Sequence, residues 1–288
     1  FWCKNIKSYF VRIKCIFINI LLLYNVLTKI HILLNMSREI KNKVILITGG
    51  ATGIGYGAAD RFLQNKALLV IILDIDEIQG NKAVNDLKSK YGPNKAVFYK
   101  CDVTKDVEVV WDKLIATYNI DVLVNNAGIG DEKDPKRLID INLTALILLS
   151  LKFMDKYRKD KLGDDKSGKG GTIINLASIY GYRVDQFFPV YQASKFAVMG
   201  FTKSLGHAYN FKRSGVRVMA ICPGFTHTNL VEEVHTFDEV IKKDIKAFLK
   251  EQLWQNVDSV GNAVVDVVEK AASGTAWLIE GGKPIKEV

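Results

Sequence analysis

From residue 43 onward, short apolar runs alternate with longer stretches in which apolar residues recur every three or four positions. Runs that are apolar throughout indicate strands buried on both faces, and the longer period indicates amphipathic helices. The pattern predicts strands at residues 44–48, 68–74, 96–101, 121–125, 172–178, 216–222 and 276–279. It predicts helices at residues 53–64, 77–91, 107–118, 138–157, 191–211 and 257–272.

This alternation predicts an α/β fold: a doubly wound, Rossmann-like parallel sheet in a single domain with helices on both faces. Residues 158–170 are polar and contain glycine, which indicates an exposed loop. Residues 226–254 are irregular and charged. We expect this last segment to fold as a short helical lid over a substrate.

The first 35 residues differ from the rest, since they contain five Lys or Arg and no Asp or Glu. Three interpretations remain open: a leader or gene-model extension absent from the natural protein, a membrane anchor at residues 16–34, or a signal peptide. Asn25 and Lys29 interrupt the apolar run, and no small-residue cleavage site precedes Met36. We therefore expect residues 36–288 to be the working domain, with no membrane contact unless residues 1–35 are native.

Charge and cysteine content exclude several classes of protein. The net charge of +9 falls to +4 without the five basic residues of the N-terminal segment, and no basic stripe with interleaved aromatics is present. This pattern argues against a nucleic-acid partner. The four cysteines have no CxxC or metal-ligand spacing, so we expect no metal and a reducing, cytoplasmic location.

A glycine-rich turn connects the first predicted strand to the first predicted helix, with the sequence TGGATGIG at residues 48–55. Glycine allows the backbone to turn tightly and to approach a pyrophosphate closely, and the following helix N-terminus offers free N–H groups. The turn predicts a dinucleotide site at Gly49, Thr52, Gly53, Ile54 and Gly55.

The second predicted strand ends in Asp74, about 20 residues after the glycine turn. Its carboxylate can accept both hydroxyls of an adenosine ribose, and it would repel a 2′-phosphate. The expected cofactor is therefore NAD, not NADP.

A second motif lies at Tyr191 and Lys195, which are four residues apart and therefore on one face of a helix. A nearby ammonium stabilises phenolate and moves a tyrosine toward acid/base chemistry near neutral pH. Ser178 is the last residue of the fifth predicted strand, at the sheet edge where α/β ligands bind. We expect Ser178 and Tyr191 to contact the same substrate oxygen.

These motifs, with the Asn125–Gly128 turn, Asn142 and Pro223-Gly224, resemble in order the short-chain dehydrogenase/reductase family. The resemblance covers nearly all of residues 43–279. It implies a catalytic set of Asn142, Ser178, Tyr191 and Lys195, in which Asn142 holds a water of a proton relay through Lys195. It also implies further cofactor contacts beside Tyr191 and Lys195, namely Asp102, Val103, Asn126, Ala127, Gly128, Pro223, Gly224, Thr226 and Thr228.

A closer similarity is to NAD-dependent 15-hydroxyprostaglandin dehydrogenases and insect-type alcohol dehydrogenases, through stretches such as NNAGIGDEK and PVYQASKFAVMGFTKSL. The mammalian prostaglandin enzymes carry a substrate-contacting Gln where this chain has Phe188. The departure removes a donor to the substrate and leaves the catalytic assignment unchanged.

Aromatic and aliphatic residues surround the expected route to Tyr191. They predict a large apolar pocket lined by Ser178, Tyr180, Phe188, Tyr191 and Phe225, with further contributions from Ile179, Tyr182, Phe187, Leu230, Val231 and Phe237. The expected substrate is an apolar secondary or long-chain alcohol, or the matching carbonyl compound.

Three alternatives stay open: a small-alcohol dehydrogenase, an NADPH carbonyl reductase, and a catalytically silent binding or storage relative. The helices that contain Leu138 and Tyr191 carry more apolar residues than one sheet face needs, which predicts a homodimer or tetramer.

Overall fold

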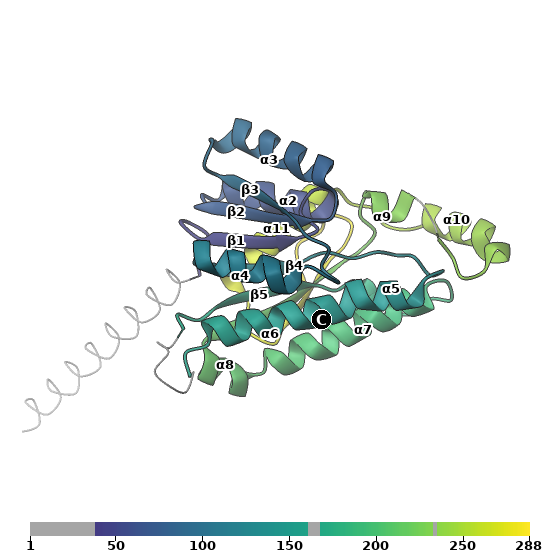
Figure 1. Ribbon diagram of the computed structural model, residues 1–288. Coiled ribbons are helices and arrows are strands. Elements are labelled where there is room, and N and C mark those ends of the chain that lie inside the picture. The colour runs from purple at the N-terminus through teal and green to yellow at the C-terminus, as the bar shows by residue number, and fades with distance from the viewer. Residues whose placement is uncertain (1–37, 161–167, 233–234) are drawn as a thin grey trace, which may run out of the picture. The chain divides into compact units, whose positions relative to one another are not determined.

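The computed structural model describes residues 38–160, 168–232 and 235–288. Its strands are β1 (Val44–Thr48), β2 (Leu69–Asp74), β3 (Ala96–Lys100), β4 (Val122–Asn125), β5 (Gly171–Leu176), β6 (Val216–Pro223), β7 (Ala276–Ile279) and β8 (Lys286–Glu287). They form one sheet in the order β3-β2-β1-β4-β5-β6-β7-β8, of which Figure 1 labels the part from β3 to β5. Neighbours pair in parallel from β3 to β7, and only β8 is antiparallel. This confirms the predicted doubly wound sheet.

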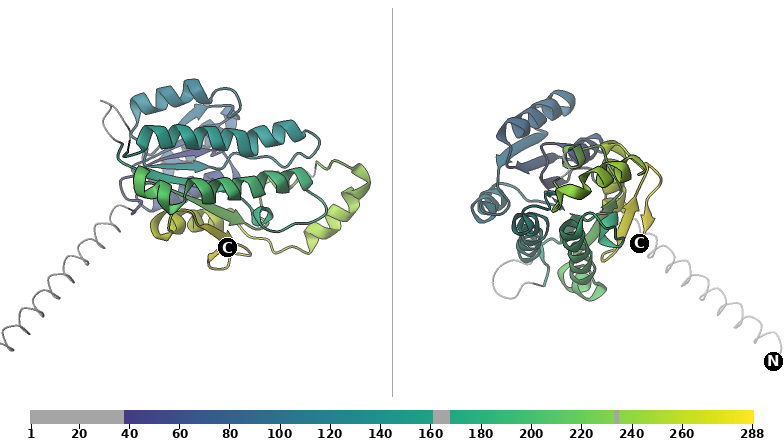
Figure 2. Two further views of the ribbon diagram at one scale, coloured as in Figure 1. Left: turned by 90° about the horizontal axis from the view of Figure 1, so that it is seen from below. Right: turned by 90° about the vertical axis from the view of Figure 1, so that its right-hand side faces the viewer.

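Two layers of helices cover the sheet. One consists of α2 (Gly53–Gln64), α3 (Glu77–Tyr91) and α11 (Val257–Lys270), and the other of α4 (Val107–Thr117), α6 (Leu146–Tyr157) and α7 (Pro189–Leu205). Figure 2 shows the strands between these layers. Shorter helical elements are α5 (Pro135–Ile139), η1 (Asp140–Ala145), η2 (Ile179–Gly181), α8 (Ala208–Ser214), α9 (Asn229–Glu232), η3 (Glu239–Ile241) and α10 (Lys242–Lys250).

The central strands are buried on both faces, as their unbroken apolar runs predicted. Along β1, Ile45 and Ile47 pack into the core cluster beneath α2 and α11, whereas Leu46 packs into the cluster beneath α4 and α6. Successive side chains of a strand point to opposite faces, so one short apolar strand supplies both layers.

The order of the strands reverses between β1 and β4. The chain proceeds from β1 to β2 and β3 on one side, and then crosses to β4 on the other side of β1. Loops that leave the carboxyl ends of β1 and β4 therefore diverge and leave a crevice at this edge of the sheet, where ligands bind in open α/β folds. The expected chemistry-bearing loops all lie at this edge.

Two predicted helices have other limits in the structure. The helix expected at 138–157 begins at Pro135, because Asp134 caps it, and it contains a π-helical stretch in η1. The helix expected at 191–211 begins at Pro189 and ends at Leu205, and α8 follows after Gly206 and His207. Proline favours the first helical position, so the earlier starts at both prolines have a common cause.

Three further expectations concern the N-terminal segment, the polar loop and the expected lid. Residues 1–35, and positions 161–167 of the expected loop, lie outside the described residues. The described part of the segment at 226–254 contains α9, η3 and α10, as the helical expectation required. Figure 1 shows α9 and α10 beyond the strand ends. Within the described ranges, no helix is long and apolar enough to span a membrane.

Candidate functional site

The glycine turn follows β1 at the crevice and is joined to the turn after β4. The Asn126 side chain donates to the carbonyl oxygens of Thr48 and Gly49 at 3.0 and 2.8 Å. Gly49 has a φ of +62°, and a Cβ there would lie 2.9 Å from the Cα of Ala127. A Cβ at Gly55 would lie 2.2 Å from the carbonyl oxygen of Gly49. Only glycine allows this close backbone approach.

The N-terminus of α2 is suited to an anion. Thr52 stands at the N-cap without a capping hydrogen bond from its side chain, and the first turn contains no acidic residue. The first N–H groups of the helix therefore have no side-chain acceptor and add to the positive end of the helix dipole. This donor set fits the pyrophosphate of a dinucleotide. Thr228, on the loop after β6, packs close to this turn, since a Cβ at Gly53 would lie 3.2 Å from its methyl group.

Asp74 ends β2 beside the glycine turn. One carboxylate oxygen accepts the Ala51 N–H at 3.0 Å, and the other accepts the Asp76 N–H at 3.1 Å. A carboxylate offers about four acceptor sites, so two remain for a ligand's hydroxyl groups. Asp102 and Val103 follow the neighbouring strand β3, at the same edge of the sheet.

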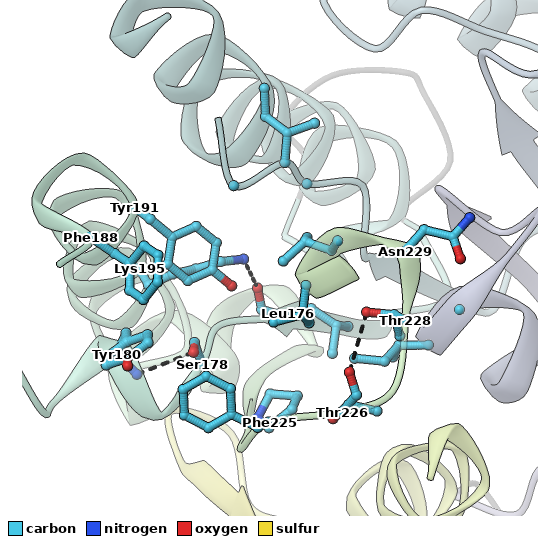
Figure 3. Close-up of a pocket in the computed structure, with 18 of the residues that line it drawn as sticks. Leu176, Ser178, Tyr180, Phe188, Tyr191, Lys195, Phe225, Thr226, Thr228 and Asn229 are labelled. Atoms are coloured by element: carbon cyan, nitrogen blue, oxygen red, sulfur yellow. Dashed lines mark hydrogen bonds between the residues drawn. The ribbon is translucent and has the colours of Figure 1, made fainter. Parts of the chain in front are cut away.

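Tyr191 and Lys195 lie on the first turns of α7 with their side chains next to each other (Figure 3). The Lys195 ammonium lies 5.4 Å from the centroid of the Tyr191 ring and donates to the Leu176 carbonyl oxygen at 2.7 Å. Burial lowers the pKa of Lys195 to about 8. The helix thus holds an ammonium against a phenol at the end of β5.

Ser178 stands opposite these two residues, in the loop after β5 and not in the strand as predicted. Its hydroxyl accepts the Tyr180 N–H at 3.1 Å at the start of η2. Burial raises the pKa of Tyr191 to about 12, and the hydrogen bond with Ser178 acts in the opposite direction. Tyr191 is therefore protonated at neutral pH in the protein without a ligand.

Asn142 lies in the π-helical stretch η1 and is 1% exposed. Its side-chain oxygen accepts the Ile129 N–H at 2.8 Å, and its amide donates to the Ile129 carbonyl at 2.9 Å and to the Ser194 hydroxyl at 3.4 Å. The side chain thus fixes the loop after β4 against α7. Single-turn π-helices often occur at functional sites.

A cavity of about 530 Å³ opens at this edge and brings most of the predicted residues together. Its size is in the range of small-molecule sites. The lining includes these predicted residues: Gly49, Thr52, Gly53, Ile54, Asn126, Gly128, Ser178, Tyr180, Phe188, Tyr191, Lys195, Pro223, Gly224, Phe225, Thr226 and Thr228. Gly55, Asp74, Asp102, Val103, Ala127 and Asn142 do not line it. They lie in the glycine turn, at neighbouring strand ends or behind the wall.

Aromatic rings form the apolar wall beside Ser178. The Tyr180 ring lies 6.0 Å from both Phe188 and Phe225 and 6.3 Å from Tyr191, measured between centroids. Three other residues that were expected in the pocket, Tyr182, Phe187 and Phe237, do not line it. Phe187 packs instead against Phe248 of α10, with centroids 5.1 Å apart.

Sequence reasoning missed some of the lining and one buried carboxylate behind it. Ile129, Asp131, Arg137, Asn229 and Leu249 also line the cavity. They come from the loop after β4, from α5 and from the lid segment. No sequence motif indicates the course of the backbone in these three parts.

The buried carboxylate is Glu132, which is 1% exposed. It accepts the N–H groups of Val190 and Tyr191 at 3.0 and 2.7 Å. Its partners are almost 60 positions away in the sequence, so no local signal could have indicated this contact.

The profile of the short chain dehydrogenase family matches residues 43–239. This chain belongs to the short-chain dehydrogenase family. It is 33% identical to a mouse 15-hydroxyprostaglandin dehydrogenase (NAD+) over 86% of this chain and 93% of that protein. It is 31% identical to alcohol dehydrogenase 1 of Ceratitis cosyra over 85% of this chain and 94% of that protein. The chain is therefore an oxidoreductase of the short-chain type.

Solved structures of short-chain dehydrogenases and reductases show the same fold. A 3-ketoacyl-(acyl-carrier-protein) reductase from Brucella melitensis, in complex with NADH, superposes with a TM-score of 0.69 at 24% identity. The match covers 84% of this chain and 98% of the reductase. The two proteins therefore share one fold, and the shared part takes in nearly the whole length of the reductase.

Proposed function

We propose that this short-chain dehydrogenase oxidises the hydroxyl of an apolar alcohol to a carbonyl, reversibly and with NAD. The observation that carries the proposal is the joint lining of one cavity by the glycine turn and by Ser178, Tyr191 and Lys195. A dinucleotide site and an acid/base pair thus face the same space, as a hydride-transfer enzyme requires.

In this mechanism Tyr191 exchanges a proton with the substrate oxygen, and Ser178 donates a hydrogen bond to the same atom. Bound NAD supplies the acceptor for the hydride that leaves the carbinol carbon. The charge of Lys195, 5.4 Å from the Tyr191 ring centroid, favours the phenolate that oxidation needs. Before the substrate binds, the hydrogen bond from Ser178 also favours the phenolate, since it lowers the Tyr191 pKa.

The proton then leaves through Lys195 toward Asn142 and water. Both amide hydrogens of Asn142 are engaged, by the Ile129 carbonyl and by Ser194. Its oxygen accepts one N–H and has a second acceptor site free. A relay water would use that remaining site.

We further propose that NAD is preferred over NADP. The two acceptor sites left on Asp74 suit the two ribose hydroxyls of NAD, whereas a 2′-phosphate would meet a carboxylate already fixed by Ala51 and Asp76. Like charges placed together in a site cost several kcal/mol. The mouse relative's name specifies NAD+. In this proposal Asp102 and Val103 flank the adenine, and Thr226 and Thr228 contact the nicotinamide carboxamide.

The substrate class follows from the wall of Tyr180, Phe188 and Phe225, which offers aromatic area and few polar groups. A large apolar alcohol fits such a wall. A small alcohol is the second candidate, because the closely spaced rings can also restrict the space beside Ser178, and the Ceratitis relative is called an alcohol dehydrogenase.

A single assay tests the function and separates the candidates. Purified chain and NAD are mixed with primary and secondary alcohols of increasing chain length, and NADH is followed by absorbance. We expect turnover that improves with chain length. A maximum at two to four carbons, roughly the size a small pocket admits, would favour the small-alcohol enzyme. Binding of NAD without turnover of any alcohol would indicate a silent relative.

A further inference from the structure

The helix that carries Tyr191 has no N-terminal cap of its own. Phe188 stands at the N-cap position of α7 and has no polar side chain, and Pro189 has no N–H. The Gln192 N–H donates to the Phe188 carbonyl oxygen within the helix. The backbone donors that remain in the first turn are those of Val190 and Tyr191, and buried donors without partners are costly.

A distant carboxylate accepts both of these donors. Glu132 comes from the loop between β4 and α5, and its two oxygens accept the Val190 N–H at 3.0 Å and the Tyr191 N–H at 2.7 Å. The side chain is buried, and burial raises its pKa while the two N–H groups act in the opposite direction. A negative charge at this end also complements the helix dipole.

Glu132 does not reach the reacting atoms. It is absent from the cavity lining, although its neighbour Asp131 is present. Its backbone N–H donates to the His235 carbonyl oxygen at 3.0 Å, so the same residue also contacts the segment before α10. That backbone contact does not depend on the side chain, so a substitution at Glu132 tests the carboxylate alone.

We propose that Glu132 is a positioning residue: its carboxylate fixes the first turn of α7 and thereby the place of the Tyr191 side chain in the cavity. This inference rests on the proposed function of Tyr191. Tyr191 is the third residue of the helix, so a first turn that frays moves the phenol relative to Ser178, which belongs to a different loop. Small displacements of a catalytic group are costly, with about 1 Å costing up to 10²-fold in rate.

The test is Glu132→Gln, which keeps the size of the side chain. Its amide group offers one acceptor oxygen where the carboxylate offers two, and its NH₂ would face an N–H donor. We expect kcat to fall about 10- to 100-fold, with the KM for the alcohol changed less than about threefold. The matched control is Asp60→Asn, which alters another buried carboxylate with two donors, Lys90 and Tyr91, away from the cavity. We expect this control to lose stability and keep its kcat.

A second measurement does not need activity. Hydrogen exchange in the full chain should show protected amides at Val190 and Tyr191 in the parent. At least one of these two amides should lose protection in Glu132→Gln, whereas that of Val198 in the middle of α7 should keep it. Unprotected amides in the parent, or an active parent whose Glu132→Gln variant keeps its kcat as the control does, would overturn the inference. A parent that oxidises no alcohol, with exchange as expected, would instead contradict the proposed function.

Discussion

Tyr191 shows how the environment of one side chain sets its chemistry. Burial raises the pKa of its phenol to about 12, which keeps the proton in place in the protein alone. Burial also lowers the pKa of Lys195 to about 8, because keeping the ammonium charged away from water costs free energy. In the proposed mechanism, the positive charge of a bound nicotinamide would favour loss of the phenol's proton. The pair would then act only when the cofactor is present.

Tyr191→Phe removes the acid/base oxygen and keeps the ring. Loss of general acid–base catalysis costs about 10²–10⁴-fold, so we expect kcat to fall by that factor while the dissociation constant for NAD stays nearly unchanged. Tyr99→Phe is the control, since Tyr99 lies in the edge strand β3, donates to the Tyr118 hydroxyl and does not line the cavity. Steady-state kinetics and quenching of tryptophan fluorescence by NAD measure the two effects. Near-normal turnover of Tyr191→Phe would refute the mechanism.

The pH dependence of the reaction should have opposite signs in the two directions. Oxidation needs the phenolate of Tyr191, so its kcat should rise as pH increases toward the raised pKa of that group. Carbonyl reduction needs the phenol and should slow over the same range. Lys195 loses its charge above about pH 8, which weakens the stabilisation of phenolate, so the rise should flatten there. Profiles measured from about pH 6 to about pH 10 with the same slope in both directions would contradict this assignment.

Asp74→Asn tests the choice of cofactor. The substitution removes the charge and nearly preserves the shape. We expect the parent to favour NAD over NADP at least about 100-fold in kcat/KM, and the variant to lose most of that preference. Glu77→Ala removes a charge from an exposed residue paired with Lys100 and should leave the ratio as it is. Equal efficiency of the parent with both cofactors would show that Asp74 does not discriminate.

At the level of single residues, the sequence allowed those predictions that depend on short spacing. Tyr191 and Lys195 meet because a helix brings positions four apart together, and the glycine turn is recognisable because strand, turn and helix are contiguous. Glu132 could not be found this way, because its contact with α7 depends on the path of a loop. The hydrogen bonds of the Asn142 side chain to Ile129 could not be predicted for the same reason.

At the level of elements, periodicity located every strand of the parallel sheet and misplaced some helix ends. The apolar periodicity continues on both sides of Gly206 and His207, so it gave no reason to end the predicted helix there. In the structure α7 ends at Leu205 and α8 begins at Ala208. The two-residue strand β8 is too short to leave a pattern. Element identity depends on many residues, and a boundary depends on one or two caps.

Helix α10 should control access for large substrates. Its Phe248 packs against Phe187 and Phe225, with centroids 5.1 and 6.1 Å apart, and Phe225 lines the cavity. Phe248→Ala should raise the KM for long-chain alcohols about two- to tenfold, the equivalent of about 0.5–1.5 kcal/mol for an aromatic pair, with little change for short ones. Phe237→Ala changes an exposed ring of the same segment that does not line the cavity. Equal effects of the two variants would rule out this role for α10.

At the level of the whole domain, the topology explains why distant motifs converge. The glycine turn, the Asn126 turn, Ser178 and Pro223-Gly224 follow β1, β4, β5 and β6, which are neighbours in the sheet and parallel. Parallel strands end at one edge, so motifs as distant in the sequence as Gly49 and Gly224 line one cavity. The predicted fold class alone was therefore enough to bring these residues together, although it could not give the shape of the pocket.

The outer face of α6 and α7 leads to the last prediction, a homodimer or tetramer. Part of the apolar content of the helices that suggested it is buried inside the domain, including Leu138, Ala145 and Leu149, whereas Ile141 is half-buried. Other apolar residues, however, stay exposed on the two adjacent helices: Leu148 and Leu151, one turn apart on α6, and Phe196 on α7, at 50%, 46% and 42%. Large apolar side chains that stay exposed on helices of one layer are typical of an interface between identical subunits.

Sedimentation velocity at micromolar concentration should therefore show a dimer or tetramer. A Leu148→Glu, Leu151→Glu variant should sediment as a monomer, because association would bury two carboxylates without partners. Ile78→Glu is the control, since Ile78 is 81% exposed on α3, in the opposite helical layer, and should leave the assembly intact. A monomeric parent would contradict the prediction outright. An unchanged assembly in the double variant would place the interface on another face, and the exposed leucines of α6 would then need a different partner.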